Sequence, residues 1–446
     1  MEIFELLTEL LRKKKWQELK EILTEMNEQD IAELFMELEE RDLTLIYRLL
    51  PKELAAEVFV NMEPEYQELL IRAFSDTELR EVLDELYVDD AVDLIEEMPA
   101  TLVKRILKHT DPDTRKSINE ILRYPEDSAG SLMTIEYVDL KRSMTVSDAF
   151  TRIRRTGVDK ETIYTCYVTD SKRKLKGYVT VKDLLLADEN AEIREIMEDN
   201  VISVTTHEDK EIVADLFQKY DLVVLPVVDN ENRLIGIITV DDAIDVLQEE
   251  ITEDMELMAG ITPTDKPYLR MGVLENFKKR IPWLMLLMVS ATFTEKIITH
   301  FEGALTACVA LTAFIPMLTG TCGNCGNQSS STIIRGLSLG EIEFRDTLKV
   351  VLKELAIALV CGITLAVVNF LKLMIFDDIG WQVALVVSVT MIAAVVFAKV
   401  VGSVLPVIAK KIGFDPAVMS SPFISTIVDA VTLIIYFAIA SSVLNL

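Results

Sequence analysis

Cysteine is scarce in this sequence, with five residues among 446, and the five are dispersed along the chain. An odd, dispersed set does not build a disulfide framework, so the chain is expected to occupy a reducing compartment. The first 30 residues carry charges throughout and lack the uninterrupted apolar stretch of a secretory signal. The N-terminal part is therefore expected to remain in the cytosol.

Basic residues are also in short supply, since 45 Lys and Arg face 73 Asp and Glu. Residues 1–270 hold 62 of the acids and 33 of the bases, a net charge of −29, whereas the remaining 176 residues hold 11 acids and 12 bases, a net of +1. Such an acidic excess repels nucleic acid and anionic headgroups and attracts cations. The composition excludes a nucleic-acid partner and favours metal ions.

The segment up to residue 128 is predicted to be an acidic all-α domain. Apolar residues recur there at i, i+3, i+4 and i+7, the period of an amphipathic helix. A helix of about ten residues is marginal alone, so these helices are expected to stack as a helical solenoid. The clearest examples are residues 31–38, 53–62, 78–86, 90–98 and 101–109.

Residues 129–249 contain an internal repeat. The stretch VTDSKRKLKGYVTVKDLL at 168–185 aligns without gaps on VVDNENRLIGIITVDDAI at 227–244. Both copies predict a strand, an Asp-led turn, a second strand ending in Thr-Val, and a helix. The layout resembles a pair of cystathionine-β-synthase (CBS) domains, here 129–195 and 196–249. The resemblance implies an α/β regulatory unit that often holds an adenosine nucleotide.

Each copy of the repeat carries a Thr and Asp pair. In CBS domains, a Thr at a strand end and an Asp three residues later can hold the ribose and phosphates of a nucleotide such as ATP. Thr180 with Asp183, and Thr239 with Asp242, match this pattern. Thr and Asp are also good helix N-caps, so the alternative is that each pair only caps the following helix.

Long apolar stretches dominate the remaining part of the chain. Each has at least about 20 residues, which suits a hydrocarbon core of about 30 Å. Lys and Arg flank the ends that are expected to face the cytosol, which places the N-terminus in the cytoplasm and the C-terminus outside. The five predicted spans cover residues 281–301, 303–334, 350–376, 379–409 and 417–446.

Asp429 lies inside the last predicted span, where no other charged residue occurs. A carboxylate in hydrocarbon costs about 2.5 to 3.5 kcal/mol even on a mild insertion scale, so this side chain is expected to face a water-filled path or a bound cation. The alternative is a neutral, protonated Asp that is hydrogen-bonded between helices.

A glycine-rich segment, TGTCGNCGNQSSS at 319–331, interrupts the second predicted span. Glycine costs a helix about 1 kcal/mol per position, so this segment is expected to fray or to approach a neighbour closely. Unpaired backbone at membrane depth is tolerated only where it lines a cavity or is buried in protein. The segment is therefore predicted to line a pore with carbonyl, amide and hydroxyl oxygens.

Two stretches resemble the MgtE family of magnesium channels. They are PMLTGTCGNCGNQSSSTIIRGL at 316–337, which carries a GN-x-GNQ signature, and FDPAVMSSPFISTIVD at 414–429. The resemblance implies a homodimer in a bacterial plasma membrane, with a pore on its two-fold axis and Asp429 as the ion-selecting carboxylate. The pore residues so predicted are Asp429, Ser425, Thr426, Gly323, Asn324, Gly326, Asn327 and Gln328.

An acidic segment follows the second CBS copy, because residues 234–265 hold nine acids and no Lys or Arg. Like charges at i, i+4 destabilise a helix by about 0.2 to 0.5 kcal/mol per pair. In the MgtE family this segment is the plug helix, which closes the pore when Mg²⁺ screens its repulsion from other acidic surfaces; the alternative is a solvated acidic face. The regulatory acids so predicted are Asp89, Asp90, Asp93, Glu208, Asp209, Glu211, Asp241, Asp245, Glu249, Glu250, Glu253 and Asp254.

Two alternatives concern the transported ion. Carboxylate and amide oxygens also suit Co²⁺, Mn²⁺, Ca²⁺ or Zn²⁺. Cys322 and Cys325 form a C-x-x-C pair, which would serve a soft-metal or redox membrane protein. A closed zinc site needs four ligands, and no His or further Cys lies nearby in sequence, so the pair alone is a weak signal.

The sequence thus predicts a multidomain membrane protein that is not an enzyme. Its expected function is uptake of Mg²⁺, with closure when cytosolic Mg²⁺ is high. Expected partners are the lipid bilayer and a second copy of the chain. The predicted parts are a helical domain at 1–128, CBS copies at 129–195 and 196–249, a connecting plug helix at 250–275, and a five-helix pore domain at 276–446.

Overall fold

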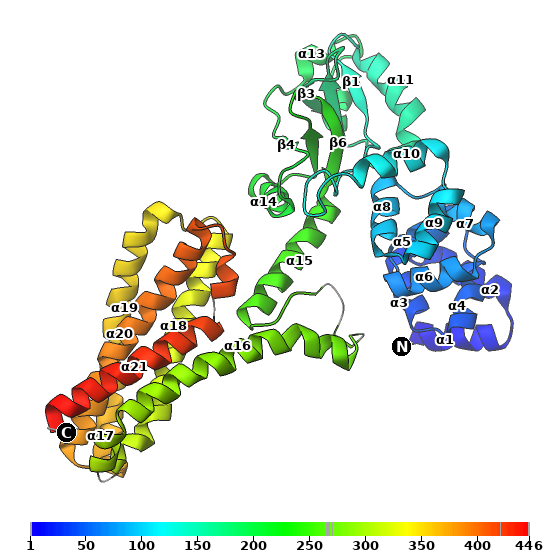
Figure 1. Ribbon diagram of the computed structural model, residues 1–446. Coiled ribbons are helices and arrows are strands. Elements are labelled where there is room, and N and C mark those ends of the chain that lie inside the picture. The colour runs from blue at the N-terminus through cyan, green and yellow to red at the C-terminus, as the bar shows by residue number, and fades with distance from the viewer. Residues whose placement is uncertain (1, 265–267, 270, 378, 420, 445–446) are drawn as a thin grey trace. The chain divides into compact units, whose positions relative to one another are not determined.

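The computed structural model describes residues 2–264, 268–269, 271–377, 379–419 and 421–444 (Figure 1). The chain divides into two compact units, Met1–Leu247 and Gln248–Leu446. The predicted segments 250–275 and 417–446 each include residues outside the described part of the chain.

The first unit begins with short helices joined by tight turns. Proline stands at the start of α6 and α10, and a capping box between Ser75 and Glu78 starts α7, so several boundaries are set by local signals. The segments predicted as helices overlap α3, α5, α7, α8 and α9, and all but the last run one to three residues past the observed helix end. The helices are α1 (Glu2–Arg12), α2 (Trp16–Glu25), α3 (Glu28–Met36), α4 (Glu40–Tyr47), α5 (Lys52–Val60), α6 (Pro64–Ala73), α7 (Asp76–Leu83), α8 (Val88–Glu97), α9 (Ala100–His109) and α10 (Pro112–Ile121).

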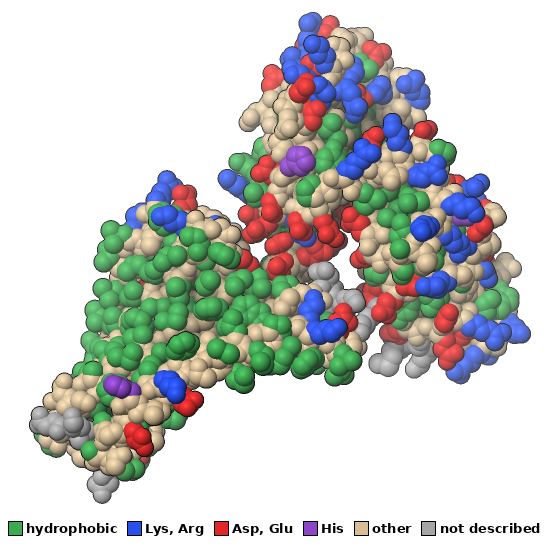
Figure 2. All heavy atoms as spheres, viewed as in Figure 1, with side chains coloured by type: hydrophobic (Ala, Val, Ile, Leu, Met, Phe, Trp, Pro, Cys, Tyr) green, Lys and Arg blue, Asp and Glu red, His purple; other side chains and the backbone are tan. Residues whose placement is uncertain are grey.

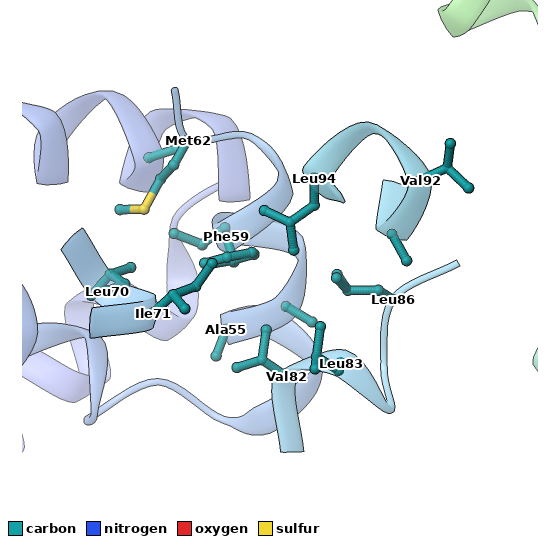
Figure 3. Close-up of a cluster of buried hydrophobic side chains, with 14 of the residues drawn as sticks. Ala55, Phe59, Met62, Leu70, Ile71, Val82, Leu83, Leu86, Val92 and Leu94 are labelled. Atoms are coloured by element: carbon teal, nitrogen blue, oxygen red, sulfur yellow. The ribbon is translucent and has the colours of Figure 1, made fainter. Parts of the chain in front are cut away.

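Side chains from successive helices hold this domain together. Figure 3 shows Phe59 of α5 among Leu70 and Ile71 of α6 and Leu94 of α8, and all four are at most 3% exposed. Burial of one such side chain contributes about 1.5 to 3 kcal/mol, which offsets the marginal stability of each short helix. The packing gives α8 a fixed place, and α8 carries three of the predicted regulatory acids.

The repeat folds as two copies of the same βαββα unit. In each three-stranded sheet the first strand pairs parallel with the second, and the second pairs antiparallel with the third. The first copy has β1 (Asp139–Lys141), α11 (Val146–Thr156), β2 (Thr165–Thr169), β3 (Leu175–Thr180), α12 (Val181–Leu186) and α13 (Ile193–Ile196). The second has β4 (Val204–Thr205), α14 (Lys210–Tyr220), β5 (Val224–Val228), β6 (Leu234–Thr239) and α15 (Val240–Met258).

The two copies exchange backbone hydrogen bonds. Thr134, which precedes the first copy's strands, bridges Ile237 of β6, and Glu198, which precedes the second copy's strands, bridges Tyr178 of β3. This reciprocal exchange joins the two copies, and their shared strand order confirms the internal repeat.

The second unit is a set of long helices. They are α16 (Val273–His300), α17 (Glu302–Ala307), α18 (Ile315–Ser338), α19 (Thr347–Phe376), α20 (Trp381–Lys411) and α21 (Ser421–Leu444). Among the described residues, four segments are long and apolar enough to cross a membrane: Val273–His300, Phe344–Phe376, Trp381–Lys411 and Pro416–Leu444. Helix α18 is absent from that set, although its 24 residues have sufficient length.

The predicted second span, 303–334, is three elements rather than one. It contains α17, a short 3₁₀ segment Val309–Phe314, and α18. Pro316 lies in the first turn of α18. Backbone N–H groups in a first turn have no acceptor within the helix, so the missing N–H of proline costs nothing there and a new helix can begin. The polar, glycine-rich sequence then lies wholly within α18, which lowers the hydropathy of this helix.

Candidate functional site

The membrane site is built where α18 and α21 meet. A Cβ added at Gly323 of α18 would lie 3.9 Å from Asp429 Oδ1 and 3.7 Å from Ser425 Oγ on α21. One turn further along α18, the Asn327 amide donates a hydrogen bond to Ser425 Oγ at 3.3 Å. Asn327 Oδ1 is buried and has no hydrogen-bond partner. A carboxylate, a hydroxyl and an amide oxygen therefore gather beside a glycine that leaves room for them.

Other predicted pore residues lie on an adjoining face of α18. Asn324 and Gln328, one turn apart, are exposed, and so are Gly320, Ser331 and Thr332. This face is polar, in contrast to the apolar exposed side chains of α16 and α19. Thr426, another predicted pore residue, donates its hydroxyl hydrogen to the Pro422 carbonyl at 3.0 Å. The exposed face of α18 suits contact with water better than contact with lipid chains.

The expectation that the glycine-rich segment frays is wrong, because α18 is an unbroken helix from residue 315 to 338. Its carbonyls are engaged in helical hydrogen bonds, so side chains supply the free oxygens. The alternative expectation, close approach, is confirmed. A Cβ added at Gly402 of α20 would lie 2.3 Å from the Gly326 carbonyl oxygen, and one at Gly326 would lie 2.8 Å from Ile424 Cγ2.

A buried ion pair lies behind this site. Lys399 of α20 is 4% exposed and Glu354 of α19 is 8% exposed, and their charged atoms are 3.7 Å apart. Ser329 of α18 links them, since its hydroxyl donates to Glu354 Oε2 at 2.6 Å and accepts from Lys399 Nζ at 3.2 Å. These three side chains connect α18, α19 and α20 next to Gln328. No motif in the sequence pointed to them.

A separate group of acids gathers inside the first unit. Asp89, Asp90 and Asp93 of α8 lie near Asp242 at the start of α15, and Glu161 joins them from the loop before β2. We call these five residues the acid cluster. Figure 2 shows acidic side chains gathered around the start of α15. Asp241 and Asp245 lie at its edge, where they act on Glu161 and Asp242 respectively.

Burial and mutual repulsion raise the pKa of every carboxyl in the acid cluster. Desolvation is the largest cause for all five; the next cause that raises the pKa is the charge of Asp90 or Asp242 for the first four and the charge of Asp241 for Asp242. The pKa reaches about 7 for Asp90 and Asp93, about 8 for Glu161 and about 6 for Asp242, and that of Asp89 is well above its usual range. Asp93 has an exposed side chain, but protein atoms surround it closely enough to weaken its hydration.

These shifts have a definite sign for stability. Unfolded carboxyls titrate near pH 4, so the folded chain holds extra protons between about pH 4 and 8. The cluster therefore costs nothing at low pH and destabilises the first unit increasingly as the pH rises towards 8. A cation that binds the ionised carboxylates opposes this loss.

Glu161 and Asp242 are members of the acid cluster that sequence reasoning missed as regulatory acids. Asp242 was assigned to nucleotide binding, and Glu161 was assigned nothing, because only the fold brings its loop to α8. Among the described residues, no three His, Cys, Asp or Glu side chains are arranged around one point as metal ligands. The cluster gathers negative charge without a preformed coordination cage.

The remaining predicted regulatory acids lie elsewhere. Asp209 caps α14 by accepting a hydrogen bond from the Glu211 backbone at 2.9 Å, and Glu208 accepts one from the Thr205 hydroxyl at 3.3 Å. It stays a prediction that Glu208, Asp209 and Glu211 bind a metal ion together with acids of other segments. A metal role for Glu249, Glu250 and Glu253, further along α15, also stays a prediction.

Asp254, in the part of α15 that belongs to the second unit, lies near another acid of that unit, Asp415. Burial, followed by the charge of Asp415, raises the pKa of Asp254 to about 6. Asp415 accepts a hydrogen bond from the Ala417 backbone at 2.7 Å, which fixes it at the turn before α21. Sequence reasoning missed Asp415, although it quoted the stretch that contains it.

The Thr180 and Asp183 pair caps α12, as the alternative interpretation held, and the Thr239 and Asp242 side chains bond to each other at the start of α15. Thr180 Oγ1 accepts from the Asp183 backbone at 3.2 Å, and Asp183 Oδ2 accepts from the Thr180 backbone at 3.1 Å. Thr239 donates its hydroxyl to Asp242 at 2.9 Å. Nucleotide contact at these pairs stays a prediction.

Comparison with known proteins shows which family the chain belongs to. Family models match residues 26–127 as an MgtE intracellular N domain, residues 129–190 and 193–249 as CBS domains, and residues 315–439 as a divalent cation transporter. A magnesium transporter MgtE from Thermus thermophilus is 38% identical over 405 residues, which cover 90% of this chain and 89% of that protein. The chain belongs to the MgtE family of magnesium transporters.

Two further comparisons support membership of the MgtE family. The magnesium transporter MgtE of Bacillus subtilis is 32% identical over 86% of this chain and 84% of its own length. The crystal structure of the cytosolic domain of the Mg²⁺ channel MgtE in complex with ATP is 42% identical, with a TM-score of 0.52, and covers 54% of this chain and 98% of that one. The predicted order of helical domain, CBS pair and apolar helices is therefore confirmed, as is a multi-pass membrane protein.

In this MgtE family member, Cys322 and Cys325 are free and buried on α18, where they pack in the apolar core of the helical unit. Replacement of both by Ser is expected to leave Mg²⁺ flux into liposomes unchanged, because neither thiol reaches the polar face that carries Asn324 and Gln328. Loss of flux in a variant that still folds and inserts would favour the soft-metal hypothesis instead.

Proposed function

We propose that this protein is a Mg²⁺-selective channel whose pore forms between two copies of the chain, with α18 as a fifth span. The observation that carries the proposal is the meeting of Asp429, Ser425, Gly323 and Asn327 between α18 and α21, next to an exposed polar face. One chain supplies a single carboxylate there. A second copy related by two-fold symmetry would supply another across the axis.

This arrangement suits Mg²⁺ for a physical reason. The ion dehydrates reluctantly and is usually held by one or two carboxylates together with its own waters. Two Asp429 carboxylates with the amide oxygens of Asn324, Asn327 and Gln328 would hold a largely hydrated ion. A monovalent cation gains half the Coulomb energy from the same carboxylates, which favours the divalent ion.

The acid cluster supports feedback by cytosolic Mg²⁺. Repulsion among Asp89, Asp90, Asp93 and Asp242 loosens the contact between α8 and the start of α15, and bound Mg²⁺ relieves it. The ion then stabilises the compact state, which is the closed one, because it binds that state better. Asp254 and Asp415 form a second place where Mg²⁺ would relieve repulsion. The crystallised cytosolic domain of a relative is in complex with ATP, and ATP bound at the CBS pair of this chain would modulate the balance.

In the membrane, the N-terminal domains would face the cytoplasm and the C-terminal end of α21 would face outward. Lys410 and Lys411 at the end of α20 are consistent with this orientation under the positive-inside rule.

The direct test is ion uptake into liposomes that contain the full-length protein, with lumenal indicators for Mg²⁺ and Ca²⁺. Mg²⁺ entry is expected, and Ca²⁺ entry is expected to be much smaller. Equal entry of both ions, or of Co²⁺ in preference to Mg²⁺, would overturn the proposed selectivity. Absence of any flux would overturn the channel itself.

Regulation by Mg²⁺ is expected to strengthen as the pH rises from 6 to 8. Asp90, Asp93 and Glu161 lose protons over this range, and Mg²⁺ competes with protons for carboxylates. The measurement is the Mg²⁺ concentration that half-protects the full-length protein from limited proteolysis, at pH 6, 7 and 8. An unchanged midpoint across this range would contradict the prediction.

A matched pair of variants isolates the acid cluster. Asp90→Asn with Asp93→Asn removes two of its charges and is expected to flatten the pH dependence. Asp84→Asn, on an exposed acid of the same domain, is expected to behave as wild type. Equal behaviour of the two variants would mean that Mg²⁺ acts elsewhere.

A further inference from the structure

A hollow of about 310 Å³ lies on the first CBS copy, and its described lining residues include no member of the Thr and Asp pairs or of the acid cluster. Its volume is at the lower end of the range for small-molecule sites. The wall comes from β1 and the residues before it, from α11 and the loop after it, and from the turn between β2 and β3. The lining residues are Tyr137, Val138, Asp139, Arg152, Thr156, Lys160, Thr169 and Arg173.

The hollow is basic, although residues 1–270 as a whole are acidic. Among the described residues, its lining holds three bases, Arg152, Lys160 and Arg173, and one acid, Asp139, a net charge of +2. The surrounding residues 139–183 contain 11 bases and 6 acids, a net of +5, whereas residues 1–270 as a whole carry −29. Figure 2 shows Lys and Arg side chains over the part of the CBS pair that holds α11 and β1. This local reversal of sign favours an anion.

Two of the three bases have donor atoms without an acceptor. One guanidinium nitrogen of Arg152 pairs with Asp139, but its Nε is buried and has no hydrogen-bond partner in the described part of the chain. Lys160 is half-buried, and among the described residues it makes no hydrogen bond or ion pair. A buried donor without an acceptor costs about 1 to 3 kcal/mol, so a bound acceptor would be stabilising here.

The third base is held in position. Arg173 donates to the Tyr137 hydroxyl at 3.0 Å and to the Leu234 carbonyl at 3.4 Å, and Tyr137 donates to the same carbonyl at 3.3 Å. Asp139 is occupied on both sides, by Lys141 at 3.0 Å and by Arg152. Asp139 thus orients Arg152 and forms no ion pair with Lys160 or Arg173, whose charges stay available.

We propose that this hollow binds a small soluble anion with one or two phosphate groups, through Arg152, Lys160 and Arg173. Guanidinium forks match phosphate oxygens in a bidentate manner, and Lys adds a point charge. The site is separate from the nucleotide contacts predicted at Thr180 with Asp183, and it does not depend on the proposed Mg²⁺ flux. An anion there would join the sheet of the first CBS copy to α11.

The test is calorimetric titration of the full-length protein in detergent with inorganic pyrophosphate, in a buffer free of divalent ions. Saturable binding is expected for wild type. Lys160→Gln, at a lysine without a partner, is expected to weaken it by roughly tenfold, the loss typical of one charge-assisted hydrogen bond. Lys172→Gln, at an exposed lysine outside the lining, is expected to leave it unchanged.

Three results would overturn the proposal. They are no saturable binding by wild type, equal weakening by Lys160→Gln and Lys172→Gln, and weakening by Asp183→Asn without any effect of Lys160→Gln. The last would assign pyrophosphate to the Thr180 and Asp183 pair. A retained melting temperature in Lys160→Gln confirms that its loss of binding does not come from unfolding.

Discussion

Replacement of Asp429 by Asn is expected to reduce Mg²⁺ flux to the level of empty liposomes. The carboxylate is the single acid of α21, and it lies 3.9 Å from where a Cβ at Gly323 would stand. Asn preserves the volume and the hydrogen-bonding capacity but removes the charge that binds a divalent ion. The variant should therefore fold and insert normally while losing permeation.

The assay needs a control for charge removal in the same unit. Asp346→Asn changes a half-buried acid before α19 that is paired with Lys349 at 2.8 Å, and it is expected to keep wild-type flux. Unchanged flux in Asp429→Asn would remove Asp429 from the permeation path. A poorly inserted protein would be recognised by its reduced yield in the liposome fraction.

Replacement of Lys399 by Met is expected to destabilise the helical unit by about 3 to 5 kcal/mol, the range for breaking one side of a buried pair. Glu354, which is 8% exposed, would lose its cationic partner, and among the described residues the Ser329 hydroxyl would be its remaining hydrogen-bond partner. The apparent melting temperature of the detergent-solubilised protein measures the effect. Flux should fall as well, because Ser329 no longer fixes α18 beside Gln328.

A second substitution distinguishes the pair from simple loss of packing. Addition of Glu354→Met to Lys399→Met is expected to recover most of the stability, since apolar residues often replace a buried ion pair without cost. Lys353→Met, at an exposed neighbour of Glu354, is expected to have little effect. A double variant that is less stable than Lys399→Met would show that Glu354 has another essential partner.

The sequence was sufficient for features whose signal is local. Apolar periodicity predicted the short helices, the repeat predicted the paired sheets, and an isolated acid in an apolar run singled out Asp429. Contacts between segments that are distant in the sequence could not be predicted from it. Glu161 joins Asp90 only because the loop before β2 folds back towards α8, and Lys399 meets Glu354 across two helices. Neither pair is close in sequence, so no spacing rule connects them.

Glycine misled the prediction for α18 in an instructive way. Its low helix propensity argued for fraying, but propensity is a weak term beside tertiary packing. At Gly326 and Gly402 the missing side chains let two backbones touch, and the contacts so gained keep the helix intact. The pore role of Asn327 stays a prediction, whereas the expected fraying of the backbone is wrong.

The contact between Gly326 and Gly402 also has a mechanical consequence. A Cβ at Gly402 would clash with the Gly326 carbonyl oxygen, so any side chain larger than hydrogen at this position would push α20 away from α18. The two backbones are in contact here, and the position of α18 depends on that of α20. A displacement of α18 beside Asp429 is therefore expected to be accompanied by a displacement of α20.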